Sequence, residues 1–220
     1  MKKLMLLALA AISALLVVPT FASAAPIHAQ THAGGNPGAF TVTGGTSQLV
    51  RTSGSGSHGE AVGGSGTFEN TTTGTVKLTF HKVTSALGNC GSTTEGHAEL
   101  AGGGTVTTTT LPFHLVTLPG GQPGILITSA NGHFATYRCG GITINVNGTG
   151  ILGTITSPAC GGTSSNAVLS FSQTAGVQNH KSYTGATYNL TSTILGSTVE
   201  SGMTATAAIG FGGARTLICT

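Results

Sequence analysis

The chain has 220 residues, of which 36 are glycine, 8 are lysine or arginine and 5 are acidic. All of the acidic residues are glutamate, and neither sign of charge is clustered along the sequence. Nucleic-acid binding needs a basic patch that displaces counterions, so this composition excludes that class of function.

The N-terminus has the layout of a secretory signal peptide. Two lysines precede an uninterrupted apolar stretch, residues 4–18, and small residues follow around Ala22. This order predicts a signal peptide over residues 1–24, with cleavage after Ala24. The apolar stretch is shorter than the roughly 20 residues that span a bilayer, and no later stretch predicts a transmembrane helix. We therefore expect a secreted bacterial protein, located outside the cell or at its surface.

The remaining chain of about 196 residues has the size of one domain. Residues 25–38 are small and polar and contain two prolines, which predicts a flexible N-terminal segment. Residues 39–220 carry the regular apolar pattern and are expected to form a single all-β domain.

Short runs in which apolar and polar residues alternate recur along this domain, separated by glycine-rich turns. In chain order, we expect strands at 40–43, 48–51, 59–68, 75–81, 105–118, 124–128, 132–139, 142–146, 151–155, 167–173, 183–194, 203–209 and 215–219. Val76, Leu78 and Phe80 share one face of such a strand. The glycines of residues 59–68 favour an edge strand. Pro112 indicates an edge, a bulge or a corner between two strands.

No run after the leader shows an apolar period of 3.6 residues, so we expect no helix in the domain. Many short strands with turn signals between them are typical of sandwiches and barrels. The sequence therefore predicts an all-β fold, an antiparallel β-sandwich or closed β-barrel of roughly ten or more short strands, stapled by disulfides.

The middle of the chain predicts a hairpin and, with it, a disulfide. Asn147 and Gly148 tolerate positive φ, and they separate two apolar runs that we expect to pair. The four cysteines of a secreted chain indicate two disulfides, with three possible connectivities. The expected hairpin would bring Cys160 level with Cys139, which favours a Cys139–Cys160 disulfide and leaves Cys90 with Cys219.

Candidate catalytic groups are few. Residues 54–59 match GxGxxG, but the strand-then-helix context of a dinucleotide site is missing. No GxSxG nucleophile elbow occurs. Glu95 and His97 lie with Glu99 in a polar loop after Cys90, and they form the candidate acid–base group together with His114.

The histidines do not match a metal-binding pattern. His28 and His32 are four residues apart, but the glycines and prolines around them exclude the helix that would bring them together. His81, His114 and His133 each neighbour a phenylalanine in a strand-like run, with no ligand spacing between them. We therefore predict no metal site and no cofactor.

Four segments carry a resemblance to known proteins. TGTVKLTF, LPFHLVTL, NGHFATYRCGG and LGTITSPACG resemble the blocks of an uncharacterised family of secreted bacterial proteins. This family is glycine- and threonine-rich and is found chiefly in actinobacteria, and the resemblance covers residues 49–219. It implies a secreted all-β protein and carries no known activity, cofactor or catalytic residue. Its members have a further cysteine near positions 82–84 that this chain lacks, which leaves the partner of Cys90 open.

These features favour a non-enzymatic extracellular β-domain with a structural or ligand-binding role at or near the cell surface. A cell-wall or other extracellular glycan is the partner that this role suggests. The alternative is a secreted hydrolase that uses Glu95, His97 or His114. A small outer-membrane barrel is disfavoured because such barrels carry aromatic girdles, and this chain has no tryptophan and three tyrosines.

Overall fold

The computed structural model describes residues 27–31, 34–92 and 103–219, and these residues form strands and turns without a helix. The strands of the main sheet are β1 (Ile27–Thr31), β2 (Ala39–Arg51), β3 (Gly56–Gly59), β4 (Ala61–Phe68), β5 (Thr73–Ser85), β6 (Gly88–Gly91), β7 (Gly104–Thr107), β8 (Leu111–Thr117), β9 (Pro123–Ile127), β10 (His133–Cys139), β11 (Ile142–Gly148), β12 (Ile151–Ser157), β13 (Thr163–Phe171), β18 (Leu190–Ile194) and β19 (Ser197–Cys219). Two small hairpins are made by β14 (Gln173–Thr174) with β15 (Val177–Gln178) and by β16 (Ser182–Tyr183) with β17 (Ala186–Thr187). The all-β prediction is confirmed.

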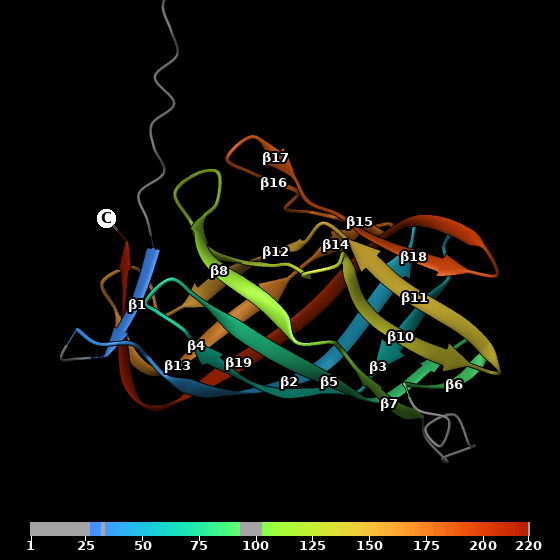
Figure 1. The fold of residues 1–220 in the computed structure, drawn as a ribbon, viewed down its shortest axis with the longest axis horizontal. Helices are drawn as coiled ribbons and strands as arrows, with labels where there is room; N and C mark the ends of the chain where they lie inside the picture. The colour runs from blue at the N-terminus through green and yellow to red at the C-terminus, as the bar shows by residue number, and fades with distance from the viewer. Residues whose placement is uncertain (1–26, 32–33, 93–102, 220) are drawn as a thin grey trace, which may run out of the picture.

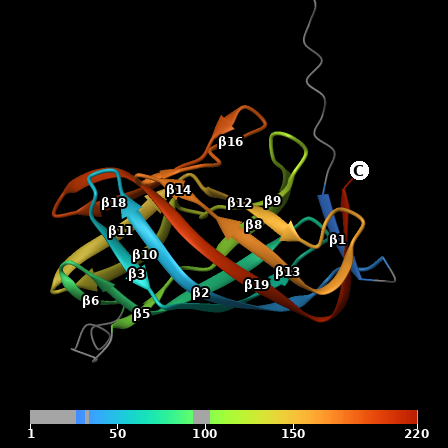
Figure 2. The same ribbon diagram turned by 180° about the vertical axis from the view of Figure 1, so that it is seen from behind.

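The antiparallel pairings close the main sheet on itself twice. The first ring runs β2-β4-β5-β8-β9-β12-β13-β19 and returns to β2. The second ring runs β2-β3-β5-β6-β10-β11-β18-β19 and also returns to β2. Figure 1 shows the first ring around β8 and β12 on the left and the second around β10, β11 and β18 on the right. Seen from behind, β2 and β19 run through both parts (Figure 2).

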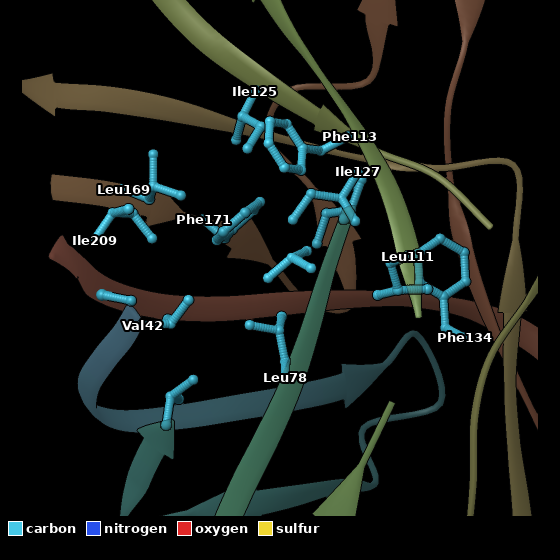
Figure 3. Packing of buried hydrophobic residues seen from close by; sticks show 14 of the residues in the cluster. Val42, Leu78, Leu111, Phe113, Ile125, Ile127, Phe134, Leu169, Phe171 and Ile209 are labelled. Atoms are coloured by element: carbon cyan, nitrogen blue, oxygen red, sulfur yellow. The ribbon is translucent and has the colours of Figure 1, made fainter. Parts of the chain in front are cut away.

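The strands fold in this way because alternate residues are apolar and face a common interior. On β5, Val76 and Leu78 are buried while Lys77 and His81 are exposed. The buried residues of both rings form one continuous core. Figure 3 shows side chains from strands far apart in sequence converging there, with Phe113 beside Ile125 and Leu111 beside Phe134. The alternation predicted from the sequence is therefore confirmed.

Glycines in β4 and β5 allow aromatic rings to pack inside the first ring. Phe40, Phe68 and Phe113 contact one another edge to face, with ring centroids 5.0–5.8 Å apart. A Cβ at Gly66 would lie 2.2 Å from Cζ of Phe40, and a Cβ at Gly74 would lie 2.7 Å from Cζ of Phe113. The strand β4 pairs with β2 on one side and β5 on the other. The expectation that residues 59–68 form an edge strand was therefore wrong.

The prediction of a hairpin turn at Asn147 and Gly148 was also wrong. The hairpin is one strand earlier, where Gly140 and Gly141, both with positive φ, connect β10 to β11. Gly148 remains in β11 and pairs with Leu190, and a Cβ there would meet a backbone oxygen of Asn189 at 2.1 Å. After Gly148 the chain crosses from the second ring to β12 in the first ring. The two apolar runs therefore do not pair.

The disulfide connectivity follows from this crossing and corrects the prediction. Cys90 is joined to Cys139, its direct partner across the β6–β10 pairing. Cys160, in the turn after β12, is joined to Cys219 at the end of β19. Cys139 and Cys160 were expected to pair, but they lie in different rings because β11 and β12 separate.

Two further expectations are changed by the structure. Ile27–Thr31, within the segment expected to be flexible, form β1 and pair with the end of β19, and Ile27 is fully buried. Of the expected strand 183–194, only Leu190–Ile194 belong to the main sheet. Positive φ values at Thr184 and Gly185 turn the β16–β17 hairpin instead. Pro112 does mark the beginning of a second strand, because β7 and β8 are separate.

The segment between β13 and β18 covers part of the outside of the first ring. Leu126 and Leu152 point away from the main core and pack with Val116 and Leu118, and Tyr183 and Tyr188 contact this second cluster. Strands β9 and β12 are thus buried on both faces. Within the described residues, no helix has the length and apolar character needed to cross a membrane.

Replacing Gly66 with alanine is expected to destabilise the fold, because the added methyl group would clash with Phe40 and with the backbone oxygen of Thr75. Overpacking of this kind costs about 1–3 kcal/mol. Gly45→Ala is the matched control, because a Cβ at this β2 position meets nothing within 4 Å. Urea unfolding should show a lower free energy of unfolding for Gly66→Ala only. Equal losses for both variants would contradict the packing described here.

Candidate functional site

The candidate acid–base group of the sequence is placed only in part. Glu95, His97 and Glu99 lie outside the described residues. His114 is exposed on β8, where it pairs with Leu126. The hydrolase interpretation stays a prediction.

The other predicted polar residues are spread over the molecule. His28 contacts the hydroxyl of Thr71 through Nδ1 at 3.2 Å. His133 contacts Asn147 through Nδ1 at 2.9 Å and Thr136 through Nε2 at 3.2 Å. Among residues 27–31, 34–92 and 103–219, no three metal-ligating side chains gather into a group that would hold an ion.

A different polar cluster lies inside the second ring at one of its ends. In the second half of β2, which lines the second ring, the inward-facing residues are Ser47, Leu49 and, at the end of the strand, Arg51. Alternation thus directs a guanidinium toward the same side of the sheet as an apolar core residue. Tyr137 of β10 and Ser57 of β3 reach the same region from the other strands.

Within the described structure, the hydrogen bonds of Arg51 go to neutral oxygen atoms. Nη2 donates to the backbone oxygens of Ser197 at 3.0 Å and Ser192 at 3.5 Å, and Nη1 donates to the hydroxyl of Ser55 at 3.4 Å. Its Nε is buried and has no hydrogen-bond partner. The ion pairs within the described part of the chain join Glu60 to Lys82 and Glu200 to Lys181. The charge of Arg51 is therefore not balanced by an acidic side chain of the described structure.

Two hydroxyl pairs lie near this guanidinium. The hydroxyls of Tyr137 and Ser57 are hydrogen-bonded at 2.8 Å. Burial raises the pKa of Tyr137 above 10.0, while the hydrogen bond to Ser57 and the positive charge of Arg51 oppose this shift. Ser201 donates a hydrogen bond to Ser192 at 2.8 Å, and both residues are fully buried. Among the residues that the structure describes, Nε of Arg51 is the one buried side-chain nitrogen or oxygen without a hydrogen-bond partner.

Arg51, Ser57, Tyr137 and Ser192 line a pocket of about 250 Å³. Its apolar walls are formed by Leu49, Ile144 and Ile194, and the exposed Leu87 lies at its rim. A second, apolar cavity of about 90 Å³ lies deeper in the ring. Leu49, Ser57 and Tyr137 line both spaces and form the partition between them. A third, apolar cavity of about 70 Å³ lies in the first ring.

The arrangement is suited to binding. A positive charge and two hydroxyls line the pocket beside aliphatic side chains, since Ser57 pairs across the sheet with Leu49 and Tyr137 pairs with Ile144. Pockets that bind small molecules combine mostly apolar walls with a few placed polar groups, although most are larger, about 300–1,000 Å³. The polar groups here come from strands of a closed sheet, which positions them more firmly than loops would.

The sequence contained the signal for Arg51, but its meaning depends on the fold. Arg51 follows Leu49 at the spacing of one strand face. The alternation of side chains along a strand therefore predicts that Arg51 faces inward. That Arg51 lies at the mouth of a ring is visible only in the fold, because β2 ends there. Tyr137 is separated from Arg51 by 86 positions in the sequence, so no local pattern brings the two together.

Comparison of the chain with protein-family models, with curated proteins and with solved structures finds no match.

The raised pKa of Tyr137 predicts a loss of stability at alkaline pH. The neutral tyrosine contributes its full stability below about pH 10, the pKa of the unfolded chain. That stability is lost as the pH rises through the higher pKa of the folded state. The free energy of unfolding should fall more steeply above about pH 10 in the wild-type protein than in Tyr137→Phe. Tyr183→Phe, on the β16–β17 hairpin, is the control and should follow the wild type. Identical pH profiles for wild type and Tyr137→Phe would show that Tyr137 is not buried in this way.

Proposed function

We propose that the protein is a secreted, non-enzymatic extracellular β-domain that binds a small ligand in the pocket at the mouth of the second ring. The observation that carries this proposal is Arg51, an inward-facing charge whose partners in the described structure are neutral oxygens. Arg51 is half-buried, so its guanidinium loses part of its hydration, and a paired anion would offset this cost. A ligand that supplies the missing partner gives a reason for placing arginine at this position.

Secretion is supported by the leader at residues 1–24 and by the four cysteines. Both cysteine pairs are disulfides. Structural disulfides persist in oxidising compartments and are rare in the cytosol. The resemblance to a family of secreted glycine- and threonine-rich proteins agrees with this location.

A binding role is supported by the preformed shape of the pocket. Strands β2, β3, β10, β11 and β18 supply most of its walls, and each is paired on both sides in the second ring. Two turns add Ser55, Ala86 and Leu87. A site that needs no rearrangement avoids the entropy cost of ordering loops when the ligand binds.

A glycan partner requires a different surface. The outside of the first ring carries an open groove of about 700 Å³ that runs over β2, β4 and β5. Hydroxyl groups of Thr41, Ser65, Thr67 and Thr75 line it together with Lys77. Binding of a cell-wall glycan in this groove stays a prediction, because its side chains lack the buried, convergent arrangement of the pocket.

Leu87→Trp turns the pocket into a reporter of binding, because the chain has no other tryptophan. We expect a subset of molecules in a library of small organic compounds to change the emission of this variant saturably. The same molecules should raise the thermal midpoint of the wild-type protein, since binding to the folded state stabilises it. Gln122→Trp, on the exposed turn between β8 and β9, is the control reporter and should not respond. Compounds that change both reporters equally, or a library without a responder, would contradict the proposal.

A further inference from the structure

We infer that the ligand of this pocket is a small carboxylic acid with a compact apolar body, held by its carboxylate at Arg51. The inference rests on the proposed function and adds the chemical class of the ligand.

The charge of the site favours an anion. Arg51 presents a planar set of donors that matches the two oxygens of a carboxylate. Its Nη1 makes only a 3.4 Å contact with the hydroxyl of Ser55, and its Nε has no partner. Because Nε is buried, Nη1 carries the donor capacity that a ligand can reach, while the backbone oxygens of Ser192 and Ser197 hold Nη2 in place.

The amount of charge favours a monoanion. Lys82 and Lys181 are engaged by Glu60 and Glu200, and the described residues that line the pocket include no lysine. A phosphate dianion in the pocket would face a single cationic side chain, which would neutralise only one of its two negative charges. A carboxylate carries one charge and is matched by one arginine.

The shape of the pocket sets the size of the ligand and its orientation. A volume of about 250 Å³ equals that of about eight water molecules at roughly 30 Å³ each. Leu49, Ile144 and Ile194 provide apolar contact but no hydrogen bond to the body of the ligand. With the carboxylate at Arg51, the apolar body points toward Tyr137 and the deeper apolar cavity of about 90 Å³. Short aliphatic and monocyclic aromatic acids have this form.

The test compares acids with their neutral amides in the Leu87→Trp reporter. Benzoate and hexanoate should bind, and benzamide and hexanamide should bind at least about tenfold more weakly, because a charge-assisted hydrogen bond is lost. Adding Arg51→Gln should weaken the binding of the two acids by a similar factor. Their affinities should then be close to those of the amides. Arg51→Lys keeps the positive charge, so each acid should still bind more tightly than its amide. Arg138→Gln removes an exposed arginine that donates to the oxygen of Gly141, and it should leave all affinities unchanged.

The outcomes separate this inference from the proposed function. If acids and amides bind equally well and both change the emission of the Leu87→Trp variant, the pocket binds ligands but the assignment of a carboxylate is wrong. If neither class binds and other compounds do, the inference fails while the proposed function stands. If no compound binds, both fail. Circular dichroism of Arg51→Gln shows whether it folds, and if it does not, the order of affinities in Arg51→Lys decides the result.

Discussion

Three long strands that are shared between the two rings determine the rest of the structure. Strands β2, β5 and β19 belong to both rings. β2 pairs with residues Ser201–Phe211 of β19, with one register shift between Ala205 and Ala207. Because each of these strands is shared, the apolar face that closes the first ring continues into the second. Closing a sheet also removes most of its free edges. This matters for a chain in which charged residues make up 6% of the sequence, since charge offers such a surface little protection against edge-to-edge association.

Much of the fold could be predicted from the sequence, because alternation is a local property. Six residues were expected to face the interior. Val76, Leu78, Ile144 and Leu190 are buried, while Phe80 and Ile142 are half-buried. The pairing of strands could not be predicted in the same way. Asn147 and Gly148 have the composition of a turn, but Gly140 and Gly141 make the turn because the strands around Gly148 are held by β10 and β18. Long-range pairing overrides turn propensity at this point, and the disulfide prediction failed with it.

The candidate site was less accessible to sequence reasoning than the fold. Histidine and glutamate draw attention as catalytic groups, yet His114 is exposed on the outside of the first ring. Arg51, Ser57 and Tyr137 match no motif, and each is unremarkable in its own strand. Their relation appears only when the second ring closes and brings β2, β3 and β10 around one space. The site therefore exists only because the strands of the second ring close around it.

The account depends most on that closure, and amide hydrogen exchange tests it directly. The closing pairings are β5 with β8, at Thr73–Val76, and β3 with β5, at Ser57 and His58. If both rings are closed, the hydrogen-bonded amides of these pairings exchange slowly, at rates close to those of β2 and β19 in the centre of the sheet. Fast exchange along β8 or β3, as at an open edge, would show that the corresponding ring is not closed and that the pocket around Arg51 does not have the walls described.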